Sequence, residues 1–173
     1  MLFSTLGLTC LLPLTPTPEV HLATSLPAAS ASPSMQTPLW RLPVKGSLTR
    51  LSEFSRPTSD WGAGHRGVDF LPESAVLAPH AGRIAWLGLA FGVPTLVLEH
   101  GDGSTEVFQP VCALRPKRAA VLAGAAIASF CASKQNDHCS RLGCVHWSYR
   151  LTDGQYLNPL RMVGLIGPAK VSV

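Results

Sequence analysis

The fold class follows first from one stretch of the sequence, Thr95-Leu96-Val97-Leu98-Glu99-His100-Gly101-Asp102-Gly103-Ser104-Thr105-Glu106-Val107-Phe108. Two short runs of mainly β-branched and apolar residues flank a turn that contains Asp-Gly, the dipeptide typical of tight β-hairpins. The stretch therefore predicts two antiparallel strands, Thr95–Glu99 and Thr105–Phe108, joined through His100–Gly103.

Short apolar runs with Gly or Pro at their ends continue on both sides of this hairpin, from Leu39 onward. They predict further strands at Ala75–Ala78, Arg83–Leu87 and Val145–Leu151. The first two flank the pair Ala81-Gly82. The chain has 15 Gly and 15 Pro in 173 residues, a composition that disfavours long helices. The predicted class is mostly β.

Two segments need a separate decision between helix and strand. Ala119–Ala128 is rich in Ala but contains Gly124, so that a helix and a loop followed by a strand both stay open. Asn158-Pro159 predicts the start of a short helix that continues to Met162, because Pro is favoured at the first helical position.

The composition indicates one packed domain. Hydrophobic residues make up 46% and charged residues 14% of the chain, and the net charge is +4. The densest basic run, Arg115–Arg118, is too short for a nucleic-acid-binding stripe, so we expect no nucleic-acid partner. The excess of basic over acidic residues supports only a mild attraction to an anionic polymer such as a bacterial wall. We expect the protein to be a monomer.

The first 38 residues differ from the rest and are predicted to be a leader rather than part of the domain at 39–173. Glu19 is their only charged residue, and they are rich in Pro, Ser and Thr. An apolar run at Leu2–Leu14 and the small-residue pattern Ala29-Ser30-Ala31 suggest a signal peptide and a secreted or cell-envelope, extracytoplasmic location. No Lys or Arg follows Met1 directly, and a Pro-rich disordered tail is the alternative.

Cysteine usage fits an exported protein, since thiols in an oxidising compartment tend to pair. Apart from Cys10 in the leader, the chain has Cys112, Cys131, Cys139 and Cys144. Four cysteines allow three connectivities, of which Cys112–Cys131 with Cys139–Cys144 closes the shortest loops. Reduced cysteines in a cytosolic protein, and a zinc site made by His138, Cys139 and Cys144, are the alternatives.

Three residues have the chemistry of a metal site. In Gly64-His65-Arg66-Gly67-Val68-Asp69, the imidazole and the carboxylate are four residues apart, and on an extended strand both leave by the same face. His146, in the apolar run Cys144-Val145-His146-Trp147, can supply a third ligand from a neighbouring strand. Three ligands and an open position are typical of catalytic zinc. A hydrogen-bonded core histidine is the alternative for His146.

Five further stretches belong to the same pattern as these motifs: Trp40–Val44, Val76–Pro79, Ala81–Ile84, His100–Gly103 and Tyr156–Leu160. Taken together, the motifs and these stretches resemble the lysostaphin/LytM-type zinc metallopeptidases, which cleave peptides of peptidoglycan. The compact secreted actinobacterial type, with a His-Cys pair and a later Cys like His138-Cys139 and Cys144, is most similar. The resemblance implies an antiparallel β-sheet core of the duplicated hybrid motif type, with short helices and long loops. It also implies Zn²⁺ held by His65, Asp69 and His146.

The sequence departs from this family at two auxiliary histidines. One position is occupied by Cys144, and the other falls on Pro110, which cannot transfer a proton. Losing general acid–base assistance typically costs about 10²–10⁴ in rate. His138 is a candidate for the missing role, with an exposed loop histidine as its alternative, and His80 and His100 are interpreted as surface histidines.

Three functional classes follow from this pattern. The first is a secreted zinc endopeptidase with a peptide groove walled by Trp61, Phe70 and Trp147, or with those aromatic residues in the core. The second is a degenerate LytM-type module that binds the wall or regulates other wall hydrolases. The third is a metal-free β-sandwich or lipoyl-like domain.

Overall fold

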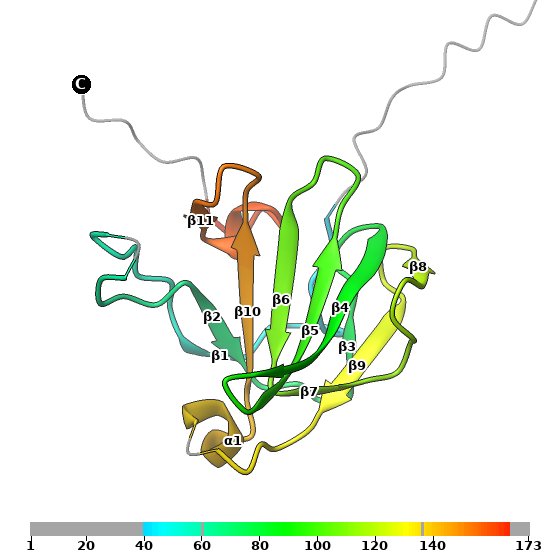
Figure 1. Cartoon of the computed structure of the whole chain (residues 1–173), viewed down its shortest axis with the longest axis horizontal. Helices are drawn as coiled ribbons and strands as arrows, with labels where there is room; N and C mark the ends of the chain where they lie inside the picture. The colour runs from blue at the N-terminus through cyan, green and yellow to red at the C-terminus, as the bar shows by residue number, and fades with distance from the viewer. Residues whose placement is uncertain (1–39, 60, 136, 167–173) are drawn as a thin grey trace, which may run out of the picture. The chain divides into compact units, whose positions relative to one another are not determined.

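The computed structural model describes residues 40–59, 61–135 and 137–166, so the predicted leader lies outside the described residues. Its main feature is an eight-stranded antiparallel sheet, shown in Figure 1. The strand order is β1 (Arg50–Ser52), β2 (Gly67–Phe70), β10 (Val145–Arg150), β6 (Thr105–Gln109), β5 (Val93–Glu99), β4 (Gly82–Ala90) and β8 (Ala120–Val121), with β11 (Tyr156–Leu157) also paired to β10.

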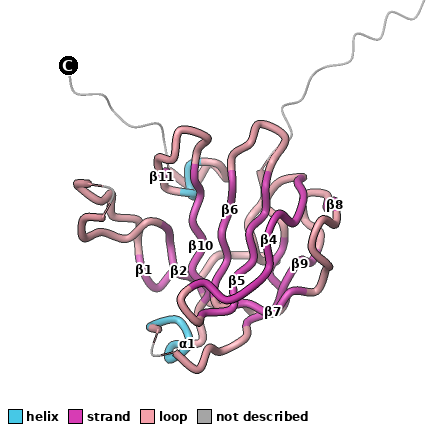
Figure 2. The backbone as a smooth tube through the Cα atoms, viewed as in Figure 1, coloured by secondary structure: helices cyan, strands magenta, loops and turns pink. Residues whose placement is uncertain are grey.

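A second, three-stranded sheet has the order β3 (Ala75–Leu77), β9 (Ala126–Phe130) and β7 (Val111–Ala113). The helical segments are short: α1 covers His138–Leu142 and η1, a 3₁₀ helix, covers Pro159–Arg161. Figure 2 shows that long loops connect many of the strands and that α1 lies beyond one end of the main sheet. No helix among the described residues is long and apolar enough to cross a membrane.

The predicted hairpin is confirmed as β5 and β6. The two strands pair antiparallel with Glu99 opposite Thr105 and Leu96 opposite Phe108. In the turn, Asp102 Oδ1 accepts hydrogen bonds from the backbone N and the Oγ of Ser104, at 2.9 and 2.6 Å. These bonds are the physical reason why an Asp-Gly sequence closes this turn.

The other predicted strands are also present, with ends that differ by a few residues. The open segment Ala119–Ala128 contains no helix: it holds β8, a loop and the start of β9. The strands on either side of Ala81-Gly82 do not pair with each other, because β3 pairs with β9 and β4 with β5. The predicted C-terminal helix is η1, and Asn158 caps it by accepting a hydrogen bond from Leu160 N at 3.0 Å.

The core lies where the apolar faces of the strands meet. Its largest fully buried side chains include Phe70, Ile84, Leu96, Phe108 and Trp147. Phe108 and Trp147 are opposite residues on β6 and β10, and their rings stack with centroids 6.4 Å apart. The prediction that Phe70 and Trp147 wall a groove is therefore wrong, whereas Trp61 is 98% exposed.

A buried polar group interrupts this core. Glu106 is 0% exposed and accepts hydrogen bonds from Trp147 Nε1 at 2.7 Å and from His100 Nε2 at 3.1 Å. His100 Nδ1 lies 3.0 Å from Ala81 O, so both ring nitrogens face acceptors, an arrangement that favours the protonated ring. The interpretation of His100 as a surface histidine is wrong, since it is 6% exposed.

One disulfide links β7 to the residue after β9, and a second links α1 to the residue before β10. They join Cys112 to Cys131 and Cys139 to Cys144, the pairing that closes the shortest loops. The Cys139–Cys144 bond closes α1 onto the start of β10. Because both thiols are oxidised, the alternative zinc site made by His138, Cys139 and Cys144 lacks its thiolate ligands.

Candidate metal centre

The main sheet brings the three predicted metal ligands together from two neighbouring strands. β2 and β10 are antiparallel, with Asp69 directly opposite His146. His65 precedes β2 and is fixed by an isolated bridge to Ser55, with reciprocal backbone hydrogen bonds of 2.8 and 2.9 Å. Side chains directly opposite in an antiparallel pair leave by the same face. The register therefore places all three side chains at one point.

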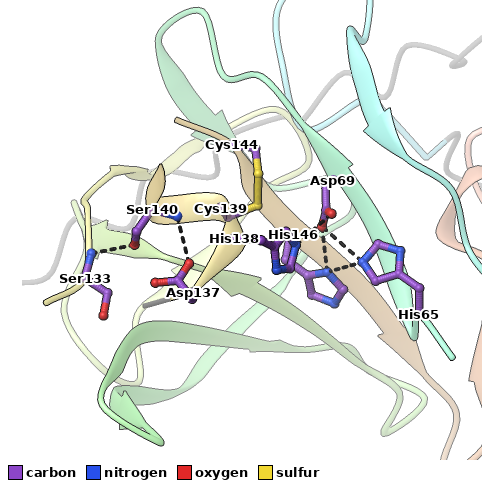
Figure 3. Close-up of a disulfide and its surroundings, with 9 residues drawn as sticks. All are labelled: His65, Asp69, Ser133, Asp137, His138, Cys139, Ser140, Cys144 and His146. Carbon is purple, nitrogen blue, oxygen red and sulfur yellow. Dashed lines mark hydrogen bonds and ion pairs between the residues drawn. A yellow bond between two sulfur atoms is a disulfide. The ribbon is translucent and has the colours of Figure 1, made fainter. Parts of the chain in front are cut away.

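Figure 3 shows the side chains of His65, Asp69 and His146 pointing toward one another. His65 Nε2 lies 3.0 Å from His146 Nδ1 and 3.2 Å from Asp69 Oδ1, and His146 Nδ1 lies 2.9 Å from Asp69 Oδ1. Asp69 is buried and the two histidines are partly exposed. The three atoms thus form a nearly equilateral triangle with access from solvent.

The tautomer of His65 follows from its other contact. His65 Nδ1 lies 2.8 Å from the carbonyl oxygen of Glu53, which can only accept, so Nδ1 carries a proton. In the neutral ring, the lone pair of His65 Nε2 then faces Asp69 Oδ1, which is also an acceptor. Two acceptors at this separation are stabilised by a metal ion between them or by a hydrogen-bond donor such as His146 Nδ1, which lies 3.0 Å from His65 Nε2 and 2.9 Å from Asp69 Oδ1.

The size of the triangle fits zinc. Tetrahedral zinc with bonds of about 2.0–2.1 Å holds its ligand atoms about 3.3 Å apart. The three observed separations, 2.9, 3.0 and 3.2 Å, lie slightly below that value. Two imidazole nitrogens and one carboxylate oxygen are also a ligand set that zinc accepts, with a fourth position left for water.

The electrostatics of the site keep the carboxylate ionised. Burial alone would raise the pKa of Asp69, but the hydrogen bonds and charges of His146, His65 and His138 outweigh it. They lower the pKa of Asp69 from 3.8 to about 2. The group is therefore an anion at every pH at which the protein would be used, as a metal ligand must be.

Gly67 leaves the space that the His146 ring occupies. A Cβ at this position would lie 2.2 Å from Trp147 O and 2.8 Å from both Cε1 and Nε2 of His146. Every other residue would therefore push β10 or the imidazole away from β2. The glycine in the His-Arg-Gly-Val-Asp stretch is thus required by the close approach of the two strands.

His138 adds a fourth polar side chain at the same point. Its Nε2 lies 2.8 Å from Asp69 Oδ2, the oxygen that does not face His65 and His146. The His138 side chain is 49% exposed, so solvent and ligands can reach it. The interpretation of His138 as an ordinary exposed loop residue therefore omitted its contact with the buried carboxylate.

The position of His138 depends on the local structure of α1. Asp137 caps the helix by accepting a hydrogen bond from Ser140 N at 2.8 Å, and Gly143 ends it with a φ of 70°. The Cys139–Cys144 disulfide, visible in Figure 3, then holds the helix at the start of β10. Asp137 and Gly143 are the sequence signals that could have predicted this helix.

The two auxiliary positions have no proton-transfer group. Cys144 is fully buried in its disulfide. Pro110 is buried and follows β6 directly. His138 is therefore the described side chain next to the triangle that can carry a proton in addition to the three candidate ligands.

Comparison with known proteins identifies the fold. The catalytic domain of lysostaphin from Staphylococcus simulans is similar with a TM-score of 0.53 and 17% identity, over 67% of this chain and 92% of that domain. A zinc-containing peptidase from Vibrio cholerae gives a TM-score of 0.55 and 19% identity, over 69% of this chain and 38% of that one. The chain has a LytM/lysostaphin-type fold.

The same fold occurs outside the peptidases. The structure of a SpoIIQ–SpoIIIAH pore-forming complex is similar with a TM-score of 0.58 and 16% identity, over 74% of this chain and 92% of that chain. No family model matches the sequence.

Curated relatives of the sequence include uncharacterized proteins of Mycobacterium tuberculosis and Mycobacterium bovis. Each is 26% identical over 130 residues, which is 70% of this chain and 50% of the relative. The chain thus spans about half the length of the curated relatives that it matches.

Proposed function

We propose that the protein is a secreted zinc endopeptidase that cleaves peptides of peptidoglycan during wall remodelling. The observation that carries this proposal is the triangle of His65 Nε2, Asp69 Oδ1 and His146 Nδ1, with sides of 2.9–3.2 Å and access from solvent. The fold of lysostaphin and of a zinc-containing peptidase supports the same reaction class.

His65, Asp69 and His146 would hold the zinc ion. A zinc ion in such a site supplies an activated water molecule and polarises the scissile carbonyl group. Asp69 would be available to the metal through Oδ1, since Oδ2 accepts the hydrogen bond from His138. Glu53 O orients the His65 ring through Nδ1 and keeps Nε2 available for the metal.

His138 is the proposed proton-transfer group. It contacts the second oxygen of Asp69, its ring centroid lies 6.2 Å from that of His65, and it is half-exposed, so that a bound peptide can contact it. In this proposal it replaces the two histidines whose positions hold Cys144 and Pro110.

A second candidate function is a wall-binding or hydrolase-regulating module without activity. The absence of proton-transfer groups at Cys144 and Pro110 favours it, since a metal site without acid–base assistance can be retained for shape alone. The similarity to a protein of the SpoIIQ–SpoIIIAH complex adds that this fold also takes part in protein assemblies.

Digestion of purified peptidoglycan separates the two functions. The full chain is incubated with the wall polymer and zinc, and released peptides are identified by mass spectrometry. Asp69→Asn and a chelator should abolish release, whereas Glu73→Ala, at an exposed position away from the triangle, should leave it unchanged. A folded, zinc-loaded protein that releases no peptides would refute the endopeptidase and support the binding module.

A further inference from the structure

A basic pocket lies on the protein surface outside the triangle of candidate ligands. Its volume is about 660 Å³, and three arginines, Arg56, Arg66 and Arg150, line it together with Tyr156. None of the described residues that line this pocket is Asp or Glu, and Asp60 is outside the described residues. The described part of the lining therefore carries positively charged side chains and no negatively charged one.

Two of the arginines lie close to the ring of one tyrosine, Tyr156. The guanidinium carbons of Arg66 and Arg150 each lie 5.9 Å from the centre of the Tyr156 ring. Arg150 Nε donates to Gly154 O at 3.1 Å, and its terminal nitrogens have no partner among the described residues. A guanidinium that is fixed in this way is prepared for a planar carboxylate, which it can bind through two parallel hydrogen bonds.

Arg56 completes the pocket from the loop between β1 and β2. Its side chain is exposed and has no hydrogen bond or ion pair with any described residue. Trp61, on the same loop, and Phe91, in the turn between β4 and β5, also line the pocket and are 98% and 101% exposed. Large aromatic side chains that are fully exposed beside a basic pocket are typical of a surface that a ligand covers.

The geometry of β10 connects the pocket to the metal centre. His146, Ser148 and Arg150 alternate with the core residues Trp147 and Tyr149, so they share one face of the strand. Arg150 follows His146 by four residue steps along the strand, which separates their Cα atoms by roughly 13 Å. An extended peptide along β10 covers this length with about four residues.

We propose that Arg56, Arg66 and Arg150 form a carboxylate subsite, which selects extended peptides with an acidic side chain or a free carboxyl terminus about four residues from the bond at the metal centre. The proposed subsite rests on the proposed endopeptidase function only in one respect, the position of the cleaved bond. Binding of the carboxylate itself needs no metal ion.

The first experiment measures binding without zinc. Extended Gly-Ala octapeptides with blocked ends carry one Glu or one Gln at the same position, and their affinities for the metal-free full chain are measured by fluorescence anisotropy. We expect the Glu peptide to bind about tenfold more tightly at low salt, with the preference reduced at high salt. Equal affinity of the Glu and Gln peptides would overturn the subsite.

Two variants and one control assign the binding to this pocket. Arg150→Gln and Arg56→Gln should each remove most of the preference for Glu. Arg115→Gln is the matched control, because Arg115 is exposed outside the pocket and donates Nε to Ala126 O at 3.2 Å, much as Arg150 does to Gly154 O. Arg56 makes no hydrogen bond or ion pair with the residues that the structure describes, so its substitution tests the subsite with little effect on the described fold. A preference that survives both substitutions contradicts the proposal.

The second experiment moves the Glu along the peptide in the presence of zinc. The cut should move with it and stay about four residues away. Cleavage at a position independent of the Glu would overturn the selection of a distant bond. Selective binding without any cleavage would keep the carboxylate subsite and refute the endopeptidase instead.

Discussion

Replacement of Gly67 by Ala should disable metal binding while the fold survives. The added methyl group would lie 2.2 Å from Trp147 O and 2.8 Å from two atoms of the His146 ring. Relief of the backbone contact requires β2 and β10 to separate by about 1 Å, and overpacking of this kind typically costs about 1–3 kcal/mol. For a domain of this size, we expect a fall in Tm of about 3–12 °C.

The effect on the metal should be larger than the effect on the fold. Ligand distances in metal sites are held to within about 0.2 Å, so a displacement of about 1 Å takes His146 out of the ligand set. Zinc affinity, measured by competition with a chromophoric chelator, should fall by at least 100-fold. Thermal unfolding with and without zinc should show that the metal no longer raises Tm.

Gly101→Ala is the matched control for this experiment. No heavy atom lies within 4 Å of a Cβ at position 101, and the φ of Gly101 is not positive. This variant should keep both the Tm and the zinc affinity of the original chain. If Gly67→Ala bound zinc as tightly as Gly101→Ala, the argument that the close approach of β2 and β10 builds the metal centre would be refuted.

Three further predictions concern the surroundings of the site and the core. His138→Ala should lower zinc affinity about 10- to 100-fold in calorimetric titrations, because it removes the 2.8 Å contact with the carboxylate ligand; unchanged affinity would contradict this role. Cys139→Ser with Cys144→Ser should lower the free energy of unfolding in urea by about 2 kcal/mol, the value expected for a loop of 5 residues, and should weaken zinc binding as His138→Ala does. Burial opposes protonation of His100, but the hydrogen bond and charge of Glu106, with the Ala81 carbonyl and Asp102, together outweigh burial and raise the pKa of His100 above 6.5. The stability that protonated His100 contributes is therefore complete below pH 6.5 and is lost as the pH rises through the raised pKa. His100→Gln should remove that dependence from a series of Tm measurements, and an unchanged slope would show that the pair does not titrate.

Local sequence patterns predicted most of the strands correctly, since these patterns depend on contacts between near neighbours. The hairpin of β5 and β6 follows from Asp102-Gly103 and from the flanking apolar residues, and the structure confirms it. Ala119–Ala128 could not be decided in this way. Its Ala residues favour a helix, but pairing of β9 with β3 and β7 outweighs that preference.

The buried Glu106 shows a second limit of sequence patterns. A charged residue in a strand is normally interpreted as solvent-facing. Glu106 is nevertheless fully buried, because Trp147 reaches it from a different strand and His100 reaches it from the turn that precedes β6. Only the tertiary structure brings these three residues together, and for this reason His100 was misplaced at the surface.

Residue order was sufficient to predict the class of fold and the candidate ligands His65, Asp69 and His146, because strand periodicity and the resemblance to a known family can both be recognised in it. The folded chain was needed to show that Phe70 and Trp147 belong to the core, that His138 contacts Asp69, and that three arginines from separate segments line one pocket. The physical reason is that burial, pKa values and pockets depend on side chains that approach one another only after the sheet has formed. A periodicity of two shows the face of a strand on which a residue lies, but not the partner that it meets there.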